Sequence, residues 1–517
     1  MRVYTYFILP KICARTKTLK KILMFLLASF YVCIIFFQDV SAATIEAKSC
    51  SYFDVSNAVL SAQRGDTVTV PAGSCTWSNE LTITKAIRLK GEGIDKTIIT
   101  SKLPLASGFT GYWLINYKPS NPVTDKDVLF EITGFTLDAA SRAGAISLRN
   151  ESSTPVRKVR VHHNKIINAI GGDTTSQNYV NTILVEGTVW GVIDNNTITG
   201  IPHFDNYGYS SRDCGKSSWD YTTYTPGSAD NMYYEDNTIT RTTISPGATF
   251  HLFVSGGIGG RYCFRYNDIT TLNDTYQNTF DMHGTQIGGT PESPTYRNRS
   301  TMGAEIYGNR ITNTYSMSQP WGHRGGRLLA FFNYIINGSQ NVRLNAYDEA
   351  AESWAPTNHK CPGLGYSACS SDGESQKQTK SYYWNNRKSS DNSILITNIT
   401  KSSNWDKWGG NQLIENLSFW NHKSNFDGTA GMGCGTLEDR PKNCREGVGY
   451  WVTDQLCSKI PSGSYGREPT TPISGILYRC TSTNTWTAYY TPYTYPHPLR
   501  EGGVEGISAP KGFKLLK

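Results

Sequence analysis

The chain has 517 residues and a formal net charge of +8, with 48 Gly, 31 Tyr and 12 Cys. Residues 1–43 contain six Lys or Arg residues and one acidic residue, so the charge of the remainder is +3. A nearly neutral chain lacks the concentrated positive charge that binds nucleic acid, and this class of partner is excluded.

The first segment, residues 1–43, has the pattern of an export signal. A strongly apolar stretch of sixteen residues spans 22–37, lysines precede it, and small residues follow at a plausible cleavage point. This arrangement resembles a secretory signal peptide. An uncleaved membrane anchor is the alternative, although sixteen residues are fewer than a spanning helix needs. We therefore expect a secreted protein, extracellular or periplasmic, with no membrane contact once the leader is removed.

Ten of the 12 cysteines remain when Cys13 and Cys33 leave with the leader. An even number of cysteines in an exported chain favours disulfides. No CxxC pair or Cys/His cluster has zinc-finger spacing, so a metal bound by cysteine is not expected. Spacing leaves the connectivity open. Our expectation is pairing between sequential neighbours, notably Cys50 with Cys75 and Cys361 with Cys369.

Residues 44–425 begin with a helix followed by short strands. Residues 54–63 have the pattern of a short amphipathic helix, and the Val-Thr-Val and Leu-Thr-Ile runs after it alternate with period two, as strands do. In a repeat protein, a helix at this end would cover the open edge and the apolar core of the first turn.

A strand followed by Asn-x-Ile recurs six times between residues 159 and 340. The repeated residues are Asn164, Asn196, Asn237, Asn267, Asn309 and Asn333. Steps of 24 to 42 residues indicate a solenoid, in which each repeat buries its apolar face against its neighbours. The surrounding β-branched and aromatic residues favour strands. Asparagine tolerates the left-handed conformation at a bend, and its amide can bond to the same group one turn away.

We interpret this pattern as an all-β fold, a right-handed parallel β-helix. An antiparallel sandwich with Asn-containing turns is the alternative, but hairpin loops rarely repeat one motif six times. The asparagine ladder is expected to be structural. His162 and His163, which precede its first member, are expected to belong to the turn rather than to ligate a metal.

The helix, GDTVTVPAGSCTW (65–77), LTITKAIRLKGEG (81–93) and the Asn-x-Ile turns together resemble the pectate-lyase-like superfamily of right-handed parallel β-helix proteins. The resemblance covers residues 50 to about 425 and is specific for fold. It implies activity only weakly, because the superfamily includes polysaccharide lyases, glycoside hydrolases, tailspike-type depolymerases and noncatalytic surface proteins. Ca²⁺ is the cofactor that the resemblance implies, yet no dense Asp/Glu cluster requires it.

Two local motifs depart from the catalytic patterns of this superfamily. In WGVIDNN, which begins at Trp190, Asn195 stands where pectate lyases have a His. The GHRGG segment at 322–326 is not the Gly-His-Gly of polygalacturonases, and no paired-Asp motif accompanies it. Catalytic residues are therefore not transferred, and the candidates come from the strand pattern.

A second set of strands, each ending in glycine, supplies these candidates. The segments are ILVEG (183–187), HLFVSGG (251–257), FDMHG (280–284) and WGHRGG (321–326). Stacked in one parallel sheet, they would alternate, with Val185, Val254 and Met282 in the core. The residues then expected on the outer face are Glu186, Ser255, Asp281, His283 and Arg324. Long inserts at 202–229 and 270–301 would rise as walls beside this face.

These residue types suit the cleavage of an acidic polysaccharide by β-elimination. The reaction needs a group that neutralises the uronate carboxylate and a base that accepts the adjacent proton. Arg324, Arg327 or Arg343 would pair with the carboxylate, and His283 would be the base. His251, at the start of its strand, is a further candidate for substrate binding.

Hydrolysis of a neutral polysaccharide would instead need two carboxyl groups. Asp281 with Glu186 or Glu305 is the best pair available, and the two glutamates are also candidates for substrate binding. A lyase is favoured because Arg and His outnumber well-paired carboxylates among the candidates. A noncatalytic carbohydrate-binding or cell-surface protein is the third possibility.

Residues 426–517 differ in composition from the repeats. Four cysteines, several prolines and many aromatic residues predict a disulfide-fastened cap over the final turns or back along the solenoid. Its aromatic residues, among them Trp451, Trp486, Tyr490 and Tyr493, are expected to pack rather than to stack on sugars. Together, the sequence predicts an exported, monomeric protein that acts on a polysaccharide.

Overall fold

The computed structural model describes residues 42–105, 111–169, 180–207, 224–242, 253–255, 259–271, 278–282, 286–289, 294–298, 301–313, 319–337, 344–346, 380–399 and 413–501. The chain divides into two compact units, Met1–Ala43 and Thr44–Lys517. Every helix and strand below lies in the second unit.

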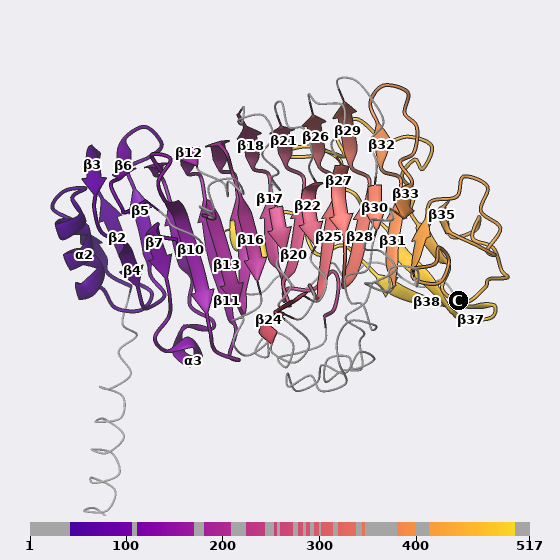
Figure 1. Ribbon diagram of the computed structural model, residues 1–517, viewed down its shortest axis with the longest axis horizontal. Helices are drawn as coiled ribbons and strands as arrows, with labels where there is room; N and C mark the ends of the chain where they lie inside the picture. The colour runs from indigo at the N-terminus through magenta and orange to yellow at the C-terminus, as the bar shows by residue number, and fades with distance from the viewer. Residues whose placement is uncertain are drawn as a thin grey trace, which may run out of the picture. The chain divides into compact units, whose positions relative to one another are not determined.

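Three long parallel sheets, A, B and C, form the body of this unit (Figure 1). The chain passes through A, B and C in the same order turn after turn, and each strand pairs in parallel with its counterparts in adjacent turns. The topology is all-β and compatible with the predicted parallel β-helix. The Asn-x-Ile repeat marks the corner from A to B, and the glycine-ended strands belong to C.

The strands of sheet A are β1 (Thr44–Glu46), β2 (Thr67–Val70), β5 (Arg88–Gly91), β8 (Phe130–Thr133), β11 (Val156–His162), β14 (Val189–Asp194), β17 (Met232–Glu235), β20 (Arg261–Arg265), β25 (Gly303–Tyr307), β28 (Arg327–Phe331), β31 (Ser381–Trp384) and β34 (Phe419–Asn421). Those of sheet B are β3 (Gly73–Trp77), β6 (Thr97–Ser101), β9 (Thr136–Asp138), β12 (Lys165–Ala169), β15 (Thr197–Gly200), β18 (Thr238–Arg241), β21 (Asp268–Thr271), β26 (Arg310–Asn313), β29 (Tyr334–Asn337) and β32 (Arg387–Lys388). Those of sheet C are β4 (Leu81–Ile83), β7 (Trp113–Tyr117), β10 (Gly144–Asn150), β13 (Ile183–Gly187), β16 (Phe204–Tyr207), β19 (Phe253–Ser255), β22 (Asn278–Met282), β27 (Gln319–His323), β30 (Leu344–Ala346) and β33 (Thr397–Ile399).

One continuous apolar core runs between the three sheets. Alternation along each strand produces it: in β2, Val68 and Val70 are buried whereas Thr67 and Thr69 are partly exposed. Later turns fill the same core with larger rings, such as those of Phe280 and Trp321, both fully buried.

The predicted asparagine ladder is present at the corner between sheets A and B. Each side-chain amide donates to the Oδ1 of the next asparagine, over 2.8–3.1 Å, from Asn164 through Asn333 to Asn386. Asn386 is a seventh member that the Asn-x-Ile pattern missed. The left-handed residue is not the asparagine but the one before it, with φ of 50° at His163 and 53° at Asn195. The ladder amide therefore supports a bend made by its neighbour.

Helix α2 (Tyr52–Ser61) begins and ends two residues before the predicted helix of 54–63. Ser51 caps it by accepting a hydrogen bond from the Asp54 amide. Its buried face, Val55, Ala58 and Val59, joins the core at the N-terminal end of the stack (Figure 1). The predicted disulfide Cys50–Cys75 is confirmed and ties the chain just before this helix to β3. A second short helix, α3, spans Pro122–Asp125.

After sheet A ends, the chain forms a separate four-stranded sheet. Its strands are β35 (Met432–Gly435), β36 (Gly449–Val452), β37 (Ile476–Ser482) and β38 (Thr485–Tyr490), and the 3₁₀ helix η3 (Pro498–Glu501) follows. Two disulfides fasten this sheet, Cys434–Cys457 and Cys444–Cys480. They interleave, so the expectation of pairing between sequential neighbours is wrong here. Cys361 and Cys369 lie outside the described residues.

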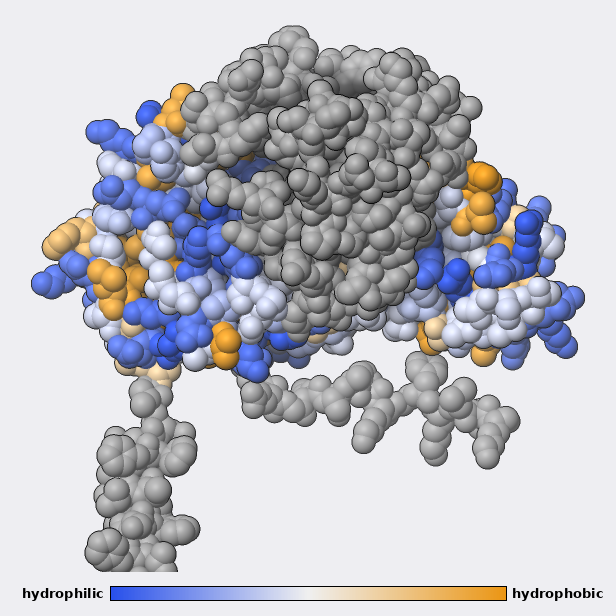
Figure 2. Space-filling view, turned by 60° about the horizontal axis from the view of Figure 1, so that its bottom comes forward, coloured by the Kyte–Doolittle hydropathy of each residue, from blue (hydrophilic) through white to orange (hydrophobic). Residues whose placement is uncertain are grey.

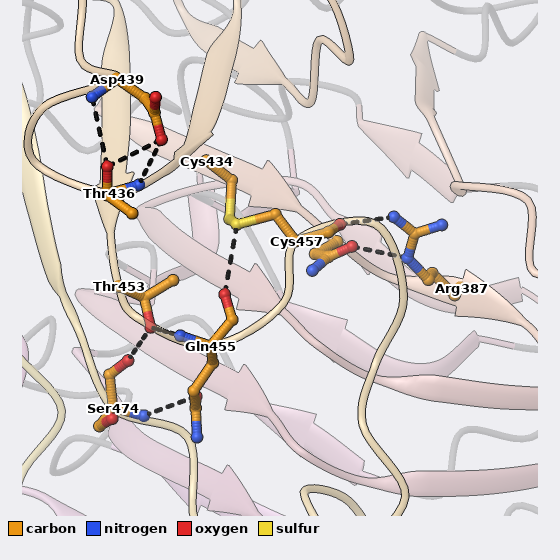
Figure 3. Close-up of a disulfide and its surroundings, with 9 residues drawn as sticks. Arg387, Cys434, Thr436, Asp439, Thr453, Gln455, Cys457 and Ser474 are labelled. Carbon is orange, nitrogen blue, oxygen red and sulfur yellow. Dashed lines mark hydrogen bonds between the residues drawn. A yellow bond between two sulfur atoms is a disulfide. The ribbon is translucent and has the colours of Figure 1, made fainter.

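Figure 3 shows how the first of these disulfides is connected to the sheets. The Arg387 guanidinium, from β32, donates to the carbonyl of Cys457 over 2.7 Å. On the other side, Thr453 donates to the Ser474 carbonyl and Gln455 accepts from the Ser474 amide. Cys457 is thus bonded to sheet B, and the residues just before it are bonded to the chain that leads into β37.

Residues 426–501, called here the C-terminal segment, pack back along the outer face of sheet A. Trp451 and Tyr490 are buried against Phe331, and the Tyr490 hydroxyl donates to Glu305 over 2.7 Å. Nearer the chain's end, Arg500 forms ion pairs with Glu235, Asp236 and Asp194. Packing of Trp451 and Tyr490 is as expected for these aromatic residues.

The described part of the surface in Figure 2 is mostly hydrophilic, with small, separated hydrophobic areas. Phe53 and Leu60 of α2 are among the exposed apolar residues, at 71% and 74%. Within the described residues, no helix is both long and apolar enough to cross a membrane. The disulfides are consistent with an exported protein.

Candidate functional site

The outer face of sheet C holds most of the described candidate residues, but its register differs from the predicted one. Val254 pairs with Asp281, and Ser255 pairs with Met282, a core residue. The predicted register, in which Val254 lines up with Met282, is therefore wrong by one residue. The prediction aligned these segments on the glycine that ends each of them, and the paired strands do not keep that alignment. In addition, 202–229 was taken for an insert although Phe204–Tyr207 is a strand of sheet C.

Asp281 and Arg324 form the best-defined ion pair of this face. Phe280 and Met282 point into the core, so Asp281 between them faces outward. Its two carboxylate oxygens accept from Nε and Nη2 of Arg324 over 2.9 and 2.6 Å. Arg324 follows β27 directly. Its backbone amide donates to the Met282 carbonyl, which holds the Arg324 backbone beside β22. Asp281 is fully buried and Arg324 is 11% exposed.

A second guanidinium–carboxylate pair lies further toward the N-terminus on the same face. Glu186 in β13 pairs in register with Arg149 in β10, and their side chains approach to 3.3 Å. The Arg149 guanidinium also lies 4.6 Å from the centre of the Trp113 ring. Both members of this ion pair are about a quarter exposed.

Glu186 and Asp281 are too far apart to act as a pair of carboxyl groups. Three strand steps separate β13 from β22 in sheet C. At about 4.8 Å a step the separation is about 14 Å, beyond the roughly 5 to 9.5 Å that glycosidases use. The predicted pairing of Asp281 with Glu186 is therefore not supported.

Asp205 is a candidate that the sequence pattern did not provide. It occupies the same register position as Val254 and Asp281, two strands before Asp281. The missing signal is explained by Asn206, which takes a core-facing position and accepts a hydrogen bond from the Arg261 amide, so polar and apolar residues do not alternate here.

Glu305 and Arg327, two predicted binding residues, lie on sheet A instead. Glu305 is fully buried, accepting from the Gly227 amide over 2.8 Å and from Tyr490. Burial raises its pKa. Arg327 is 7% exposed and lies over the rings of Tyr224 and Tyr489. Both residues lie beneath the C-terminal segment on sheet A, so the structure does not bring them onto one face with Asp281, and their role in substrate binding stays a prediction.

Three other predicted residues, His283, His251 and Arg343, lie outside the described residues, and their roles stay predictions. By alternation His283 would share the outward face with Asp281, two positions along the chain. The structure thus brings together Asp281 and Arg324 of the predicted catalytic set, with Glu186 on the same face at a distance.

Comparison with known proteins adds little to this site. No protein-family model matches the chain, and no curated protein matches it. Among solved structures, the chain is similar to ORF18 of Geobacillus virus E2, at 12% sequence identity and a TM-score of 0.30. The match covers 59% of this chain and 58% of that one, so it spans less than two thirds of either. A similarity this low supports no statement about function.

Proposed function

We propose that this protein cleaves an acidic polysaccharide by β-elimination on the outer face of sheet C. The proposed scaffold is a right-handed parallel β-helix of the pectate-lyase-like type, exported and monomeric, with α2 covering its first turn and residues 426–517 as its C-terminal cap. The observation that carries the proposal is the Arg324–Asp281 pair, a guanidinium held in a fixed plane on a face where a sugar chain can cross several turns.

The proposed role of Arg324 is to neutralise the substrate carboxylate. A guanidinium presents five N–H donors in a planar fork, and Asp281 engages two of its nitrogen atoms. Neutralising a uronate carboxylate makes the neighbouring C–H proton more acidic, which is the condition for elimination. Asp281, buried and ion-paired, is better suited to orienting Arg324 than to accepting this proton. His283 remains the proposed base.

Elimination is favoured over hydrolysis by the separation of the carboxylates of Glu186 and Asp281. The guanidinium groups of Arg149, in β10, and Arg324, directly after β27, support the same choice. The two strands are five steps or about 24 Å apart in sheet C. Two such groups would bind an extended polyanion at two points, each pairing with a carboxylate of the polymer.

Inverting hydrolysis is the second candidate, and the register of Asp205 favours it. Asp205 and Asp281 are two strand steps apart, about 10 Å between backbones, close to the separation of about 6.5 to 9.5 Å in inverting glycosidases. A noncatalytic carbohydrate-binding protein would bind a polysaccharide on the same face but would catalyse neither elimination nor hydrolysis.

The test is a cleavage assay on purified protein without its leader, with and without added Ca²⁺. Pectic, alginate, glycosaminoglycan and neutral polysaccharides are the substrates, and both unsaturated-uronate absorbance and new reducing ends are measured. Elimination predicts both signals on an acidic polymer. Arg324→Ala should lower the rate about 100-fold or more, because a charge-stabilising donor is lost, and Asp281→Asn should lower it less.

The matched control is Arg310→Ala, which removes an exposed Arg–Asp pair with Asp268 on sheet B and should leave the rate unchanged. Reducing ends without absorbance, abolished by Asp205→Asn, would replace the lyase proposal with hydrolysis. Binding without either signal across the panel would leave only the noncatalytic role.

A further inference from the structure

A compact group of polar side chains lies away from sheet C, at the corner between sheets A and B. His162 ends β11 and Asp194 ends β14, and the two are partners in register. His163 follows at the left-handed bend, with φ of 50°. One ligand atom from each residue lies within 4.8 Å of the other two. Within the described part of the chain, these three side chains therefore have the spacing that would let them bind one metal ion together.

The two imidazole rings face each other through their Nδ1 atoms. These nitrogens are 2.7 Å apart, and the ring planes are inclined by 85°. Two nitrogens at this distance share a single proton, so at least one of them presents a lone pair. Nitrogen ligands at 2.0–2.1 Å from a tetrahedral metal lie about 3.3 Å apart. A small outward rotation of the exposed His163 ring would reach that spacing.

Glu131 determines which nitrogen of His162 carries the lone pair. Its carboxylate lies 2.9 Å from Nε2 of His162, so that nitrogen donates to Glu131 and Nδ1 is the acceptor. A carboxylate on the far nitrogen of a histidine is the usual support of a metal-bound imidazole, because it fixes the tautomer and makes the ring a stronger ligand. Glu131 lies in β8, which neighbours β11 in sheet A. Its partner in register is Arg160, two residues before His162.

Asp194 supplies the third ligand atom while keeping its other partners. It accepts from Arg160 through both oxygens over 2.9 Å and from the Asn195 side-chain amide over 3.0 Å, and Arg500 approaches to 3.4 Å. A carboxylate has about four lone-pair positions, so ion pairing to guanidinium groups does not use all of them. Arg160 also donates to the carbonyl of Leu499, which places the C-terminal segment beside the group.

We propose that His162, His163 and Asp194 form a binding site for a divalent transition-metal ion, with Glu131 as the positioning residue. Two imidazole nitrogens and one carboxylate oxygen suit Zn²⁺, Ni²⁺ or Cu²⁺, whereas Ca²⁺ and Mg²⁺ take sets of oxygen ligands. Three protein ligands leave a fourth position for water or another donor. The site departs from the sequence-based expectation that these histidines do not ligate a metal, and it is independent of cleavage on sheet C.

The test is calorimetric titration of ZnCl₂ into the untagged protein without its leader. We expect saturable binding of one equivalent. His162→Gln and His163→Asn should each weaken it at least about tenfold, and Glu131→Gln about 10- to 100-fold, through loss of ligand orientation. Asparagine at 163 keeps a residue that tolerates the left-handed bend, so this variant is expected to fold.

Two further measurements separate the site from a nonspecific effect. Lys165→Gln, in the same turn and ion-paired to Asp95, should bind Zn²⁺ as the unaltered protein does. With Cu²⁺, electron paramagnetic resonance should show coupling to two nitrogens in the unaltered protein and to one in His163→Asn. Equal Zn²⁺ affinity in all variants, or no saturable binding, would overturn the proposal.

Discussion

Asn267 illustrates how a single side chain stabilises the corner between sheets A and B. Its amide donates to the Tyr234 carbonyl over 2.9 Å and to Asn309 Oδ1 over 3.1 Å, and its own Oδ1 accepts from the backbone amide of Asn237. The residue before it, Tyr266, has a left-handed φ of 56°, which costs a non-glycine residue about 1 kcal/mol. Hydrogen bonds to buried backbone groups offset that cost at every turn.

Replacing Asn267 by Ala should lower the free energy of unfolding by about 2 to 4 kcal/mol. The substitution removes several hydrogen bonds and leaves the buried Tyr234 carbonyl and Asn237 amide without those partners. Urea-induced unfolding followed by far-ultraviolet circular dichroism measures the change. Asn398→Ala is the matched control, because Asn398 is exposed, and its effect should stay within about 0.5 kcal/mol. Equal midpoints for the two variants would mean that the ladder contributes little.

At the scale of the elements, the sequence predicted strands where apolar and polar residues alternate. The Asn-x-Ile pattern located the A-to-B corners, and the glycine-ended runs located four strands of sheet C. Strand β16 was missed because Asn206 occupies a core-facing position. A polar residue that accepts a hydrogen bond inside the core, as Asn206 does from the Arg261 amide, interrupts the alternation of polar and apolar residues. The register at Val254 was wrong for another reason, because the glycines that end these segments do not line up in the sheet.

The burial of Glu305 and Arg327 could not be predicted from strand patterns. Alternation predicts that a side chain points out of the core, but it does not predict which residues cover that side chain from outside. Here the covering residues come from the C-terminal segment, such as Tyr490, which is 185 positions from Glu305. The interleaved disulfides have the same origin, since each joins cysteines that the fold of the C-terminal segment brings together rather than sequential neighbours.

Cys263 offers a way to measure how tightly the C-terminal segment is held. Among the described cysteines it is the free thiol, fully buried in the cluster that includes Leu477 and Tyr490, and burial raises its pKa. It should be unreactive until the segment detaches. Replacing Cys434 and Cys457 by Ser opens a 23-residue cross-link worth about 3 kcal/mol, so alkylation of Cys263 should become about 100-fold faster.

Peptide mapping by mass spectrometry would follow the alkylation of Cys263 itself. The matched control is Cys50→Ser with Cys75→Ser, which removes a cross-link of similar length, 25 residues, at the other end of the stack. That variant should leave the labelling rate unchanged. The same acceleration in both variants would indicate global unfolding rather than release of the segment.

At the scale of the whole molecule, three buried histidines predict that stability falls in mild acid. Burial lowers the pKa of His323 and His422 to about 4 and that of His497 to about 3. The unfolded chain takes up protons near pH 6.5, where these folded residues do not. Stability is therefore complete above about pH 6.5 and is lost as the pH falls toward about 4, by roughly 1 kcal/mol per pH unit for each histidine.

The measurement is the urea midpoint of unfolding at pH 7, 6 and 5, compared with His323→Gln. The buried Glu305 acts in the opposite direction, because burial raises its pKa, so the difference between variants is the informative quantity. Removing one titrating group should reduce the slope of stability against pH. A slope unchanged by the substitution would show that His323 is not neutral in the folded protein.

The packing of the C-terminal segment on sheet A also sets an order of events during folding. Its partners begin in the late turns, where Phe331 packs against Trp451 and Tyr490. They extend back to Arg160, which donates to the carbonyl of Arg500, 340 positions away. Contacts between residues so distant in sequence form slowly, because the intervening chain must be ordered first.

The outer face of sheet A that the C-terminal segment covers is therefore complete only after nearly all the turns have folded. Until then the outward rings of Tyr233, Tyr382 and Phe331 have no cover, although they are fully buried in the finished protein. A chain that stops early would expose this apolar strip and be prone to aggregate. Docking of residues 426–501 thus covers the apolar strip, and copies in which it has not docked should be lost from solution first.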